Sequence, residues 1–61
     1  MSSIETYLYQ LTSGFMSETS IPTEYLNNIL IVNAITRYNW IISPSHVVGW
    51  SNLYRIKSYS N

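Results

Sequence analysis

Residues 25–42, YLNNILIVNAITRYNWII, form the most apolar window of this 61-residue sequence and decide how the rest is interpreted. The window is nearly long enough to cross a membrane, but four asparagines and Arg37 interrupt it. No glycine or proline occurs between positions 23 and 43, so one continuous helix over about 23–42 is predicted. On a helical wheel its polar residues scatter around the axis instead of forming one face. A helix that is apolar on nearly all sides is usually buried all round.

A strand is the open alternative for part of this window. Six of its residues are β-branched isoleucine or valine, which lowers helix propensity and raises strand propensity. They are Ile29, Ile31, Val32, Ile35, Ile41 and Ile42. The run 29–32 alone could therefore be a short buried strand.

The N-terminal part of the chain has the pattern of an amphipathic helix. Ser2-Ser3-Ile4-Glu5 fits a capping box, in which the serine hydroxyl and the glutamate carboxylate satisfy free backbone donors. Ile4, Leu8, Leu11 and Phe15 then recur at intervals of three and four. Gly14 can end the helix, because glycine adopts the left-handed conformation at little cost. A first helix over about 3–14 is predicted.

The C-terminal part allows either a helix or a hairpin. Ser43 can cap a helix with Pro44 at its first position, which predicts a third helix over about 45–57. The alternative is a β-hairpin that pairs 46–50 with 53–59, although its turn would lack the glycine that tight hairpins prefer. The expected fold is thus a small, mainly α single domain over 1–61 with two or three helices. An α+β fold with a C-terminal β-hairpin is the alternative.

The composition favours association with other protein. Only 10% of the residues are charged, against about 25% in average soluble domains, while 46% are apolar and 15% aromatic, with a net charge of zero. A chain this short buries only ~60% of its unfolded surface, and without cysteine it has no disulfide to compensate. We therefore expect a non-enzymatic small subunit that self-associates or packs into a larger complex. The expected contact residues are Ile29, Ile31, Val32, Ile35, Tyr38, Trp40, Trp50 and Tyr54.

No catalytic, metal or cofactor site and no small-molecule substrate are expected. His46 is the single histidine, cysteine and aspartate do not occur, and the three glutamates lie far apart in the sequence. No two potential metal ligands have the i, i+4 spacing of a helical metal site. Serines lie near His46, but a serine nucleophile needs a base oriented by a third group, and no carboxylate occurs in that segment.

Nucleic-acid binding is an alternative function. Residues 42–50, ISPSHVVGW, resemble the turn and early recognition helix of helix-turn-helix proteins, whose second helix enters the major groove. The resemblance covers nine residues and implies that Ser45, His46 and Gly49 face DNA while Val47 and Trp50 pack inward. Phosphate contacts normally come from clustered Lys and Arg, and the chain has three in all.

A peripheral membrane-associated subunit is the remaining alternative. Arg37 and the asparagines of the central window make it costly to cross a bilayer. A helix lying flat in the interface needs one polar face rich in Lys and Arg, which the wheel does not show. The first residues, MSSIE, lack the positive and apolar regions of a secretory signal. An intracellular location, in cytoplasm, an organelle or a virus-infected cell, is therefore expected.

Overall fold

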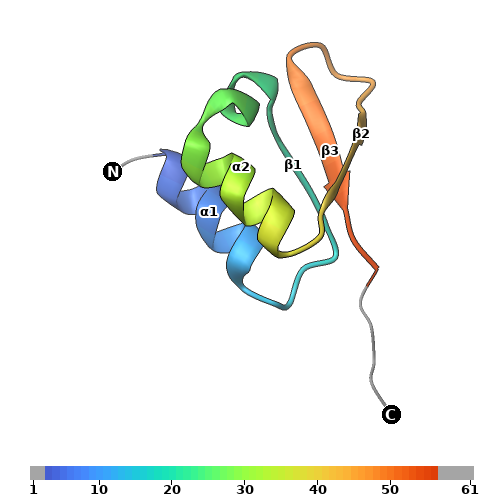
Figure 1. Ribbon diagram of the computed structural model, residues 1–61. Coiled ribbons are helices and arrows are strands. Elements are labelled where there is room, and N and C mark those ends of the chain that lie inside the picture. Colours follow the sequence, from blue (N-terminus) through green and yellow to red (C-terminus); the bar gives the residue numbers. More distant parts are fainter. Residues whose placement is uncertain (1–2, 57–61) are drawn as a thin grey trace.

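The computed structural model describes residues 3–56, in which two α-helices and a short 3-10 helix pack on one side of a three-stranded sheet (Figure 1). In chain order the elements are α1 (Ser3–Thr12), β1 (Glu18–Pro22), η1 (Thr23–Asn27), α2 (Ile29–Arg37), β2 (Ile41–Pro44) and β3 (Trp50–Tyr54). The expected mainly α class is therefore wrong. The α+β alternative fits.

The first helix is confirmed, with its end two residues earlier than expected. α1 ends at Thr12, and Gly14 follows in the left-handed region with φ 84°. The positive φ agrees with the terminating role expected for this glycine. Ser2 of the expected capping box lies outside the described residues.

The single helix expected over 23–42 is wrong, because Asn28 divides it. The stretch forms η1, α2 and β2 in succession. Asn28 has extended backbone angles, and its Oδ1 accepts hydrogen bonds from the N–H of Leu30 at 2.9 Å and of Ile31 at 3.4 Å. The asparagine thus acts as an N-cap, supplying an acceptor to backbone donors that have no partner inside the helix.

Asn39 ends α2 in the same stretch. Its φ of 61° is left-handed, and Trp40 N–H donates to Ile35 O at 2.9 Å while Asn39 N–H donates to Thr36 O at 3.4 Å. These two bonds form a Schellman motif, with asparagine in the position that glycine usually occupies. Since the chain reverses there, Ile41 and Ile42 continue as a strand instead of a helix.

The third helix expected over 45–57 is also wrong, because residues 41–54 form a β-hairpin. Positions from 57 on, in this helix and in the alternative hairpin, lie outside the described residues. The hairpin alternative is right in kind, but its strands lie elsewhere: β2 pairs with β3, and Ser51 lies inside β3 instead of in the turn. The connecting loop is 45–49, where Gly49 has φ 84°. The glycine missing from the expected turn is present in the observed loop.

The helix-turn-helix resemblance at 42–50 is overturned by the same hairpin. Ser45, His46 and Gly49 lie in a loop between two strands, so they do not begin a helix. Val47 and Trp50 are exposed and do not pack inward.

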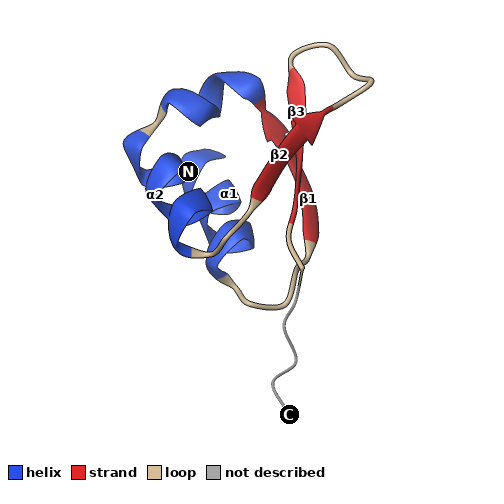
Figure 2. Cartoon of the chain, turned by 45° about the vertical axis from the view of Figure 1, so that its right-hand side comes forward, coloured by secondary structure: helices blue, strands red, loops and turns tan. Residues whose placement is uncertain are grey.

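The sheet has the order β1-β3-β2, so the last strand in the sequence is the central one (Figure 1), and Figure 2 shows the helices on one side of these strands. Both pairings are antiparallel, with Ser20 opposite Asn52 and Ser43 on the other side of the same residue. Directly opposite residues share a face of the sheet. Along β3 the residues Ser51 and Leu53 are buried, whereas Trp50, Asn52 and Tyr54 lie on the outer face.

The core lies between the helices and the sheet and draws side chains from both. Its buried members are Leu11, Ile21, Ile31, Ala34, Trp40 and Leu53. Trp40 is held at its edge and at one face: its Nε1 donates to Leu11 O at 2.9 Å, and the Arg55 guanidinium lies 4.7 Å from the centre of its ring. Arg55 Nε in turn donates to Met16 O at 2.9 Å. This chain of contacts joins the end of β3 to the segment that follows α1.

Candidate interaction surfaces

The structure separates the eight residues expected at an interface into a buried and an exposed group. Ile31 and Trp40 belong to the core, with 0% and 5% of their surface exposed. Ile35 and Tyr38 are half-buried and pack against the same core. The exposed four are Ile29, Val32, Trp50 and Tyr54. Of the eight, these last four are the ones that remain exposed and can contact a partner directly.

The first exposed apolar surface lies on α2 and consists of Ile29, Leu30 and Val32; we call it the α2 patch. Asn28 sets where the helix begins, so Ile31 and Ala34 turn inward and the patch residues turn outward. Ile29 and Leu30 are 66% and 53% exposed. Leu30 was missed by the sequence analysis, which had no means of placing the start of this helix.

The second exposed apolar surface lies on the β2–β3 hairpin. We call it the hairpin surface; it consists of Ile41, Ile42, Val47, Val48, Trp50 and Tyr54. Ile41 lies directly opposite Tyr54 on the outer face, and Ile42 lies opposite Leu53 on the face toward the helices. Val48, at 97% exposure, lies in the loop. Thr23 N–H donates to Gly49 O at 2.8 Å and fixes the base of that loop to the start of η1.

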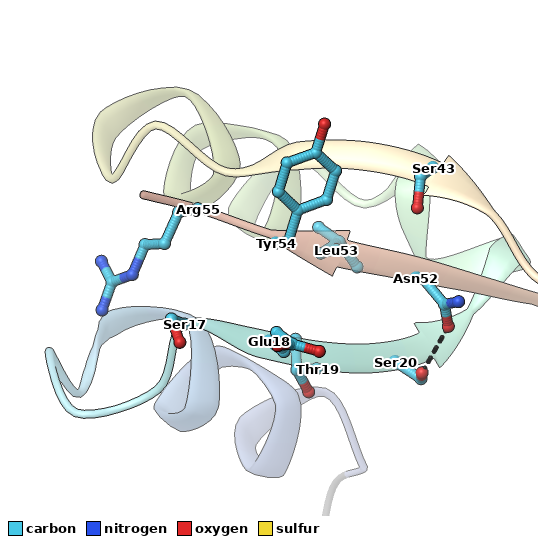
Figure 3. Close-up of a pocket in the computed structure, with 9 residues that line it drawn as sticks. All are labelled: Ser17, Glu18, Thr19, Ser20, Ser43, Asn52, Leu53, Tyr54 and Arg55. Atoms are coloured by element: carbon cyan, nitrogen blue, oxygen red, sulfur yellow. Dashed lines mark hydrogen bonds between the residues drawn. The ribbon is translucent and has the colours of Figure 1, made fainter. Parts of the chain in front are cut away.

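A groove of about 620 Å³ runs along the outer face of the sheet beside this surface (Figure 3). Its centre is an uncharged row across three strands, where Ser20 Oγ donates to Asn52 Oδ1 at 2.7 Å and Ser43 lies on the other side of Asn52. Tyr54, two residues after Asn52 on β3, rises from the sheet beside the row. The complete lining is Ser17, Glu18, Thr19, Ser20, Ser43, Asn52, Leu53, Tyr54 and Arg55.

The groove can donate and accept hydrogen bonds and can stack against a ring, but its lining has no nucleophile paired with a base. The side chain of Glu18 is exposed, and the Arg55 guanidinium is already held by Met16 O and the Trp40 ring. Ser20, the hydroxyl nearest Glu18 on the same strand face, is bonded to an amide. An oriented triad is therefore absent from the groove.

The described residues contain neither a cluster of metal ligands nor a membrane-spanning helix. Within residues 3–56 no three His, Cys, Asp or Glu side chains come together to hold a metal ion. His46 is exposed in the hairpin loop. No helix in this range has both the length and the apolar content needed to cross a bilayer.

Five residues of the α2 patch and the hairpin surface were missed by the sequence analysis: Leu30, Ile41, Ile42, Val47 and Val48. For four of them the available signal was Gly49 together with Pro44, which mark a loop between two short β-rich runs. Comparison of the chain with protein families, with curated proteins and with solved structures found no match, so function has to be argued from the two surfaces and the fold.

Proposed function

We propose that this chain is a non-enzymatic protein-interaction module. The observation that carries the proposal is the gathering of exposed large apolar side chains on the α2 patch and the hairpin surface. Contiguous exposed apolar patches on small proteins mark contact sites for other molecules. Trp50 and Tyr54 belong to the residue types that contribute most to binding at protein interfaces.

The distribution of charge supports the same function. The segments that carry the two surfaces, 29–36 and 41–54, contain no Lys, Arg, Asp or Glu. Depletion of charged residues together with enrichment of aromatic ones is the compositional mark of the centre of a protein interface. Charged residues such as Glu5, Glu24 and Arg37 lie elsewhere on the exposed surface.

Size-exclusion chromatography of the chain, taken gently from its native source, tests the proposal. We expect the wild type to elute in an assembly larger than 7.1 kDa and the double variant Leu30→Lys, Trp50→Lys to elute as the monomer. Thr36→Lys, which adds the same charge at an exposed polar position of α2, is the matched control and should stay in the assembly. Circular dichroism confirms that each variant is folded. A wild type that is monomeric both in extracts and at micromolar concentration contradicts the proposal.

A second candidate, DNA binding, is favoured by the topology. The order helix, strand, helix, helix, strand, strand, with the strands arranged β1-β3-β2, resembles winged helix-turn-helix domains. In helix-turn-helix proteins the second helix of the pair lies in the major groove, and this position belongs to α2. Its exposed residues Asn33, Thr36 and Arg37 form one side of the helix. Asparagine pairs with adenine and arginine with guanine in direct base readout.

Fluorescence anisotropy with duplex DNA at low salt separates the two candidates. If α2 reads DNA, Asn33→Ala and Arg37→Ala each weaken binding by about 1–3 kcal/mol when they contact a base. Arg37→Ala instead lowers the salt slope by about 1 when the arginine contacts a phosphate. Thr6→Ala, at an exposed position of α1, is the control. No binding to any duplex at low salt excludes this candidate.

A further inference from the structure

β2 is an edge strand of the described sheet, and it carries no charged side chain. In the order β1-β3-β2 it pairs with β3 alone, so half of its backbone hydrogen-bonding groups face away from the sheet. Proteins commonly shield such an edge with charged side chains, proline or a covering element. β2 has no charged residue, its one proline is at its far end, and Ile41 and Ile42 are both exposed.

The opposite edge of the same sheet shows the difference. Both edge strands end with a proline, but β1 begins with the exposed carboxylate of Glu18. It is also packed against α1, where Thr19 Oγ1 donates to Gln10 Oε1 at 2.7 Å. Of the two edges, only that of β2 is both uncharged and lined by apolar side chains.

We propose that two copies of this chain pair antiparallel through β2, which joins their sheets into one of six strands. The proposal rests on the interaction function above and names its partner. A two-fold axis normal to the sheet beside Ser43 makes the contact self-complementary, because antiparallel pairing of one strand with itself repeats every contact twice. It sets Ser43 beside Ser43 of the second copy and Ile42 beside its Pro44, on a shared face in each case. It also brings each hairpin loop, with Val47 and Val48, to the start of the other copy's β2.

The absence of charge favours an identical partner. Two hairpin surfaces meet without like-charge repulsion, because segment 41–54 holds no ionised Lys, Arg, Asp or Glu. An acidic or basic partner would find no complementary charge there and would have to lose its own hydration. The second copy brings an equally uncharged apolar surface.

The exposed area at the edge suits a weak dimer. Ile41, Ile42, Val47 and Val48, which lie on β2 and in its loop, are between 45% and 97% exposed. With about 100 Å² for a whole aliphatic side chain, they offer about 250 Å² of apolar area. Interfaces are about 56–65% apolar, so this area corresponds to about 400 Å² per partner. That lies just below the ~500 Å² of a stable specific contact, which makes the expected dimer a weak and reversible one.

Sedimentation equilibrium of the full chain from 1 to about 100 μM tests the pairing, since specific contacts of modest size have micromolar dissociation constants. We expect a reversible monomer–dimer equilibrium in the wild type. Ile41→Lys, which adds a charge to the free edge, should raise the dissociation constant at least about tenfold. Thr6→Lys, which adds the same charge at an exposed polar position of α1, is the matched control and should leave it unchanged. Leu30→Lys tests whether the α2 patch makes the contact instead. If Ile41→Lys does not fold by circular dichroism, Ile41→Thr keeps the strand propensity and removes part of the apolar contact.

Disulfide trapping locates the contact independently, because the chain has no cysteine of its own. Ser43→Cys should form a cross-linked dimer with oxidised glutathione, whereas Ser20→Cys, on the same face at the β1 edge, should not. A wild type that stays monomeric overturns the β2 pairing. The interaction function is then tested only by the size of the assembly in which the native chain elutes. A dimer lost in Leu30→Lys and kept in Ile41→Lys also overturns the pairing, but it supports the interaction function.

Discussion

Trp40 acts as a C-terminal cap for a helix almost thirty residues earlier in the chain. Leu11 lies in the last turn of α1, where backbone carbonyls have no partner inside the helix, and the indole Nε1 supplies one. We expect Trp40→Phe to lower the free energy of unfolding by about 1–3 kcal/mol, because the buried carbonyl loses its donor. Urea unfolding of dilute monomer measures this change. Trp50→Phe, at an exposed position, should change it by less than about 0.5 kcal/mol, and equal effects would refute the capping role.

Asn39 is the only non-glycine residue in the described chain with positive φ. A β-carbon in the left-handed region costs roughly 1–2 kcal/mol, which the short polar side chain of asparagine partly offsets. Asn39→Ala should therefore destabilise the fold by about 1 kcal/mol, and Asn39→Gly should be neutral or stabilising. Thermal unfolding followed by circular dichroism detects both changes. The control Asn33→Ala, on the exposed side of α2, should not lower the melting temperature, because alanine is the better helix former there.

At the scale of one element, α2 depends on the amide of Asn28. We expect Asn28→Ala to cost about 1 kcal/mol of stability, and Asn28→Asp to retain most of it, because aspartate is an equally good N-cap. Chemical denaturation of both variants provides the measurement. Asn27→Ala, one residue earlier and exposed, is the matched control. An Asn28→Ala variant as stable as this control would show that the two hydrogen bonds contribute nothing to the helix start.

The same asparagines show how far the elements could be predicted. α1 was predictable because Ile4, Leu8 and Leu11 repeat with helical spacing and their signal is local. Asn28 and Asn39 looked like polar interruptions on a helical wheel, yet they are the cap and the terminator of α2. Their role depends on backbone angles that a wheel cannot represent. The strands were predicted as helices or loops because each strand is short and is stabilised by a partner strand far away in the sequence.

At the scale of the whole molecule, Arg55 fastens the end of the sheet to the helical layer. Arg55→Lys keeps the charge but removes the planar group over Trp40 and the Nε bond to Met16. We expect a loss of about 1–2 kcal/mol, measured by urea unfolding of dilute monomer. Arg37→Lys, at an exposed position, should have almost no effect. Equal stability of the two variants would show that the contact of Arg55 with Trp40 is incidental.

The candidate surfaces were predictable in kind and only partly in place. Low charge and many aromatic residues already indicated a protein partner, and Ile29, Val32, Trp50 and Tyr54 are indeed exposed. Ile31 and Trp40 could not be assigned to the core from the sequence, because their burial depends on how the sheet and the helices meet. Tertiary packing therefore determines which of the eight expected contact residues lie in the core and which lie on the surface.

The placement of β3 between two earlier strands affects how the chain folds. The paired residues of β1 and β3 lie between 28 positions apart, for Pro22 and Trp50, and 36 positions apart, for Glu18 and Tyr54. Almost half of the chain must therefore close into a loop before any rung between these strands can form. Such long closures slow the search for the native topology. Until the ribosome has added β3, the strand that pairs with both β1 and β2 is missing. During that time the apolar side chains of β1 and β2 are exposed to chaperones and to other nascent chains.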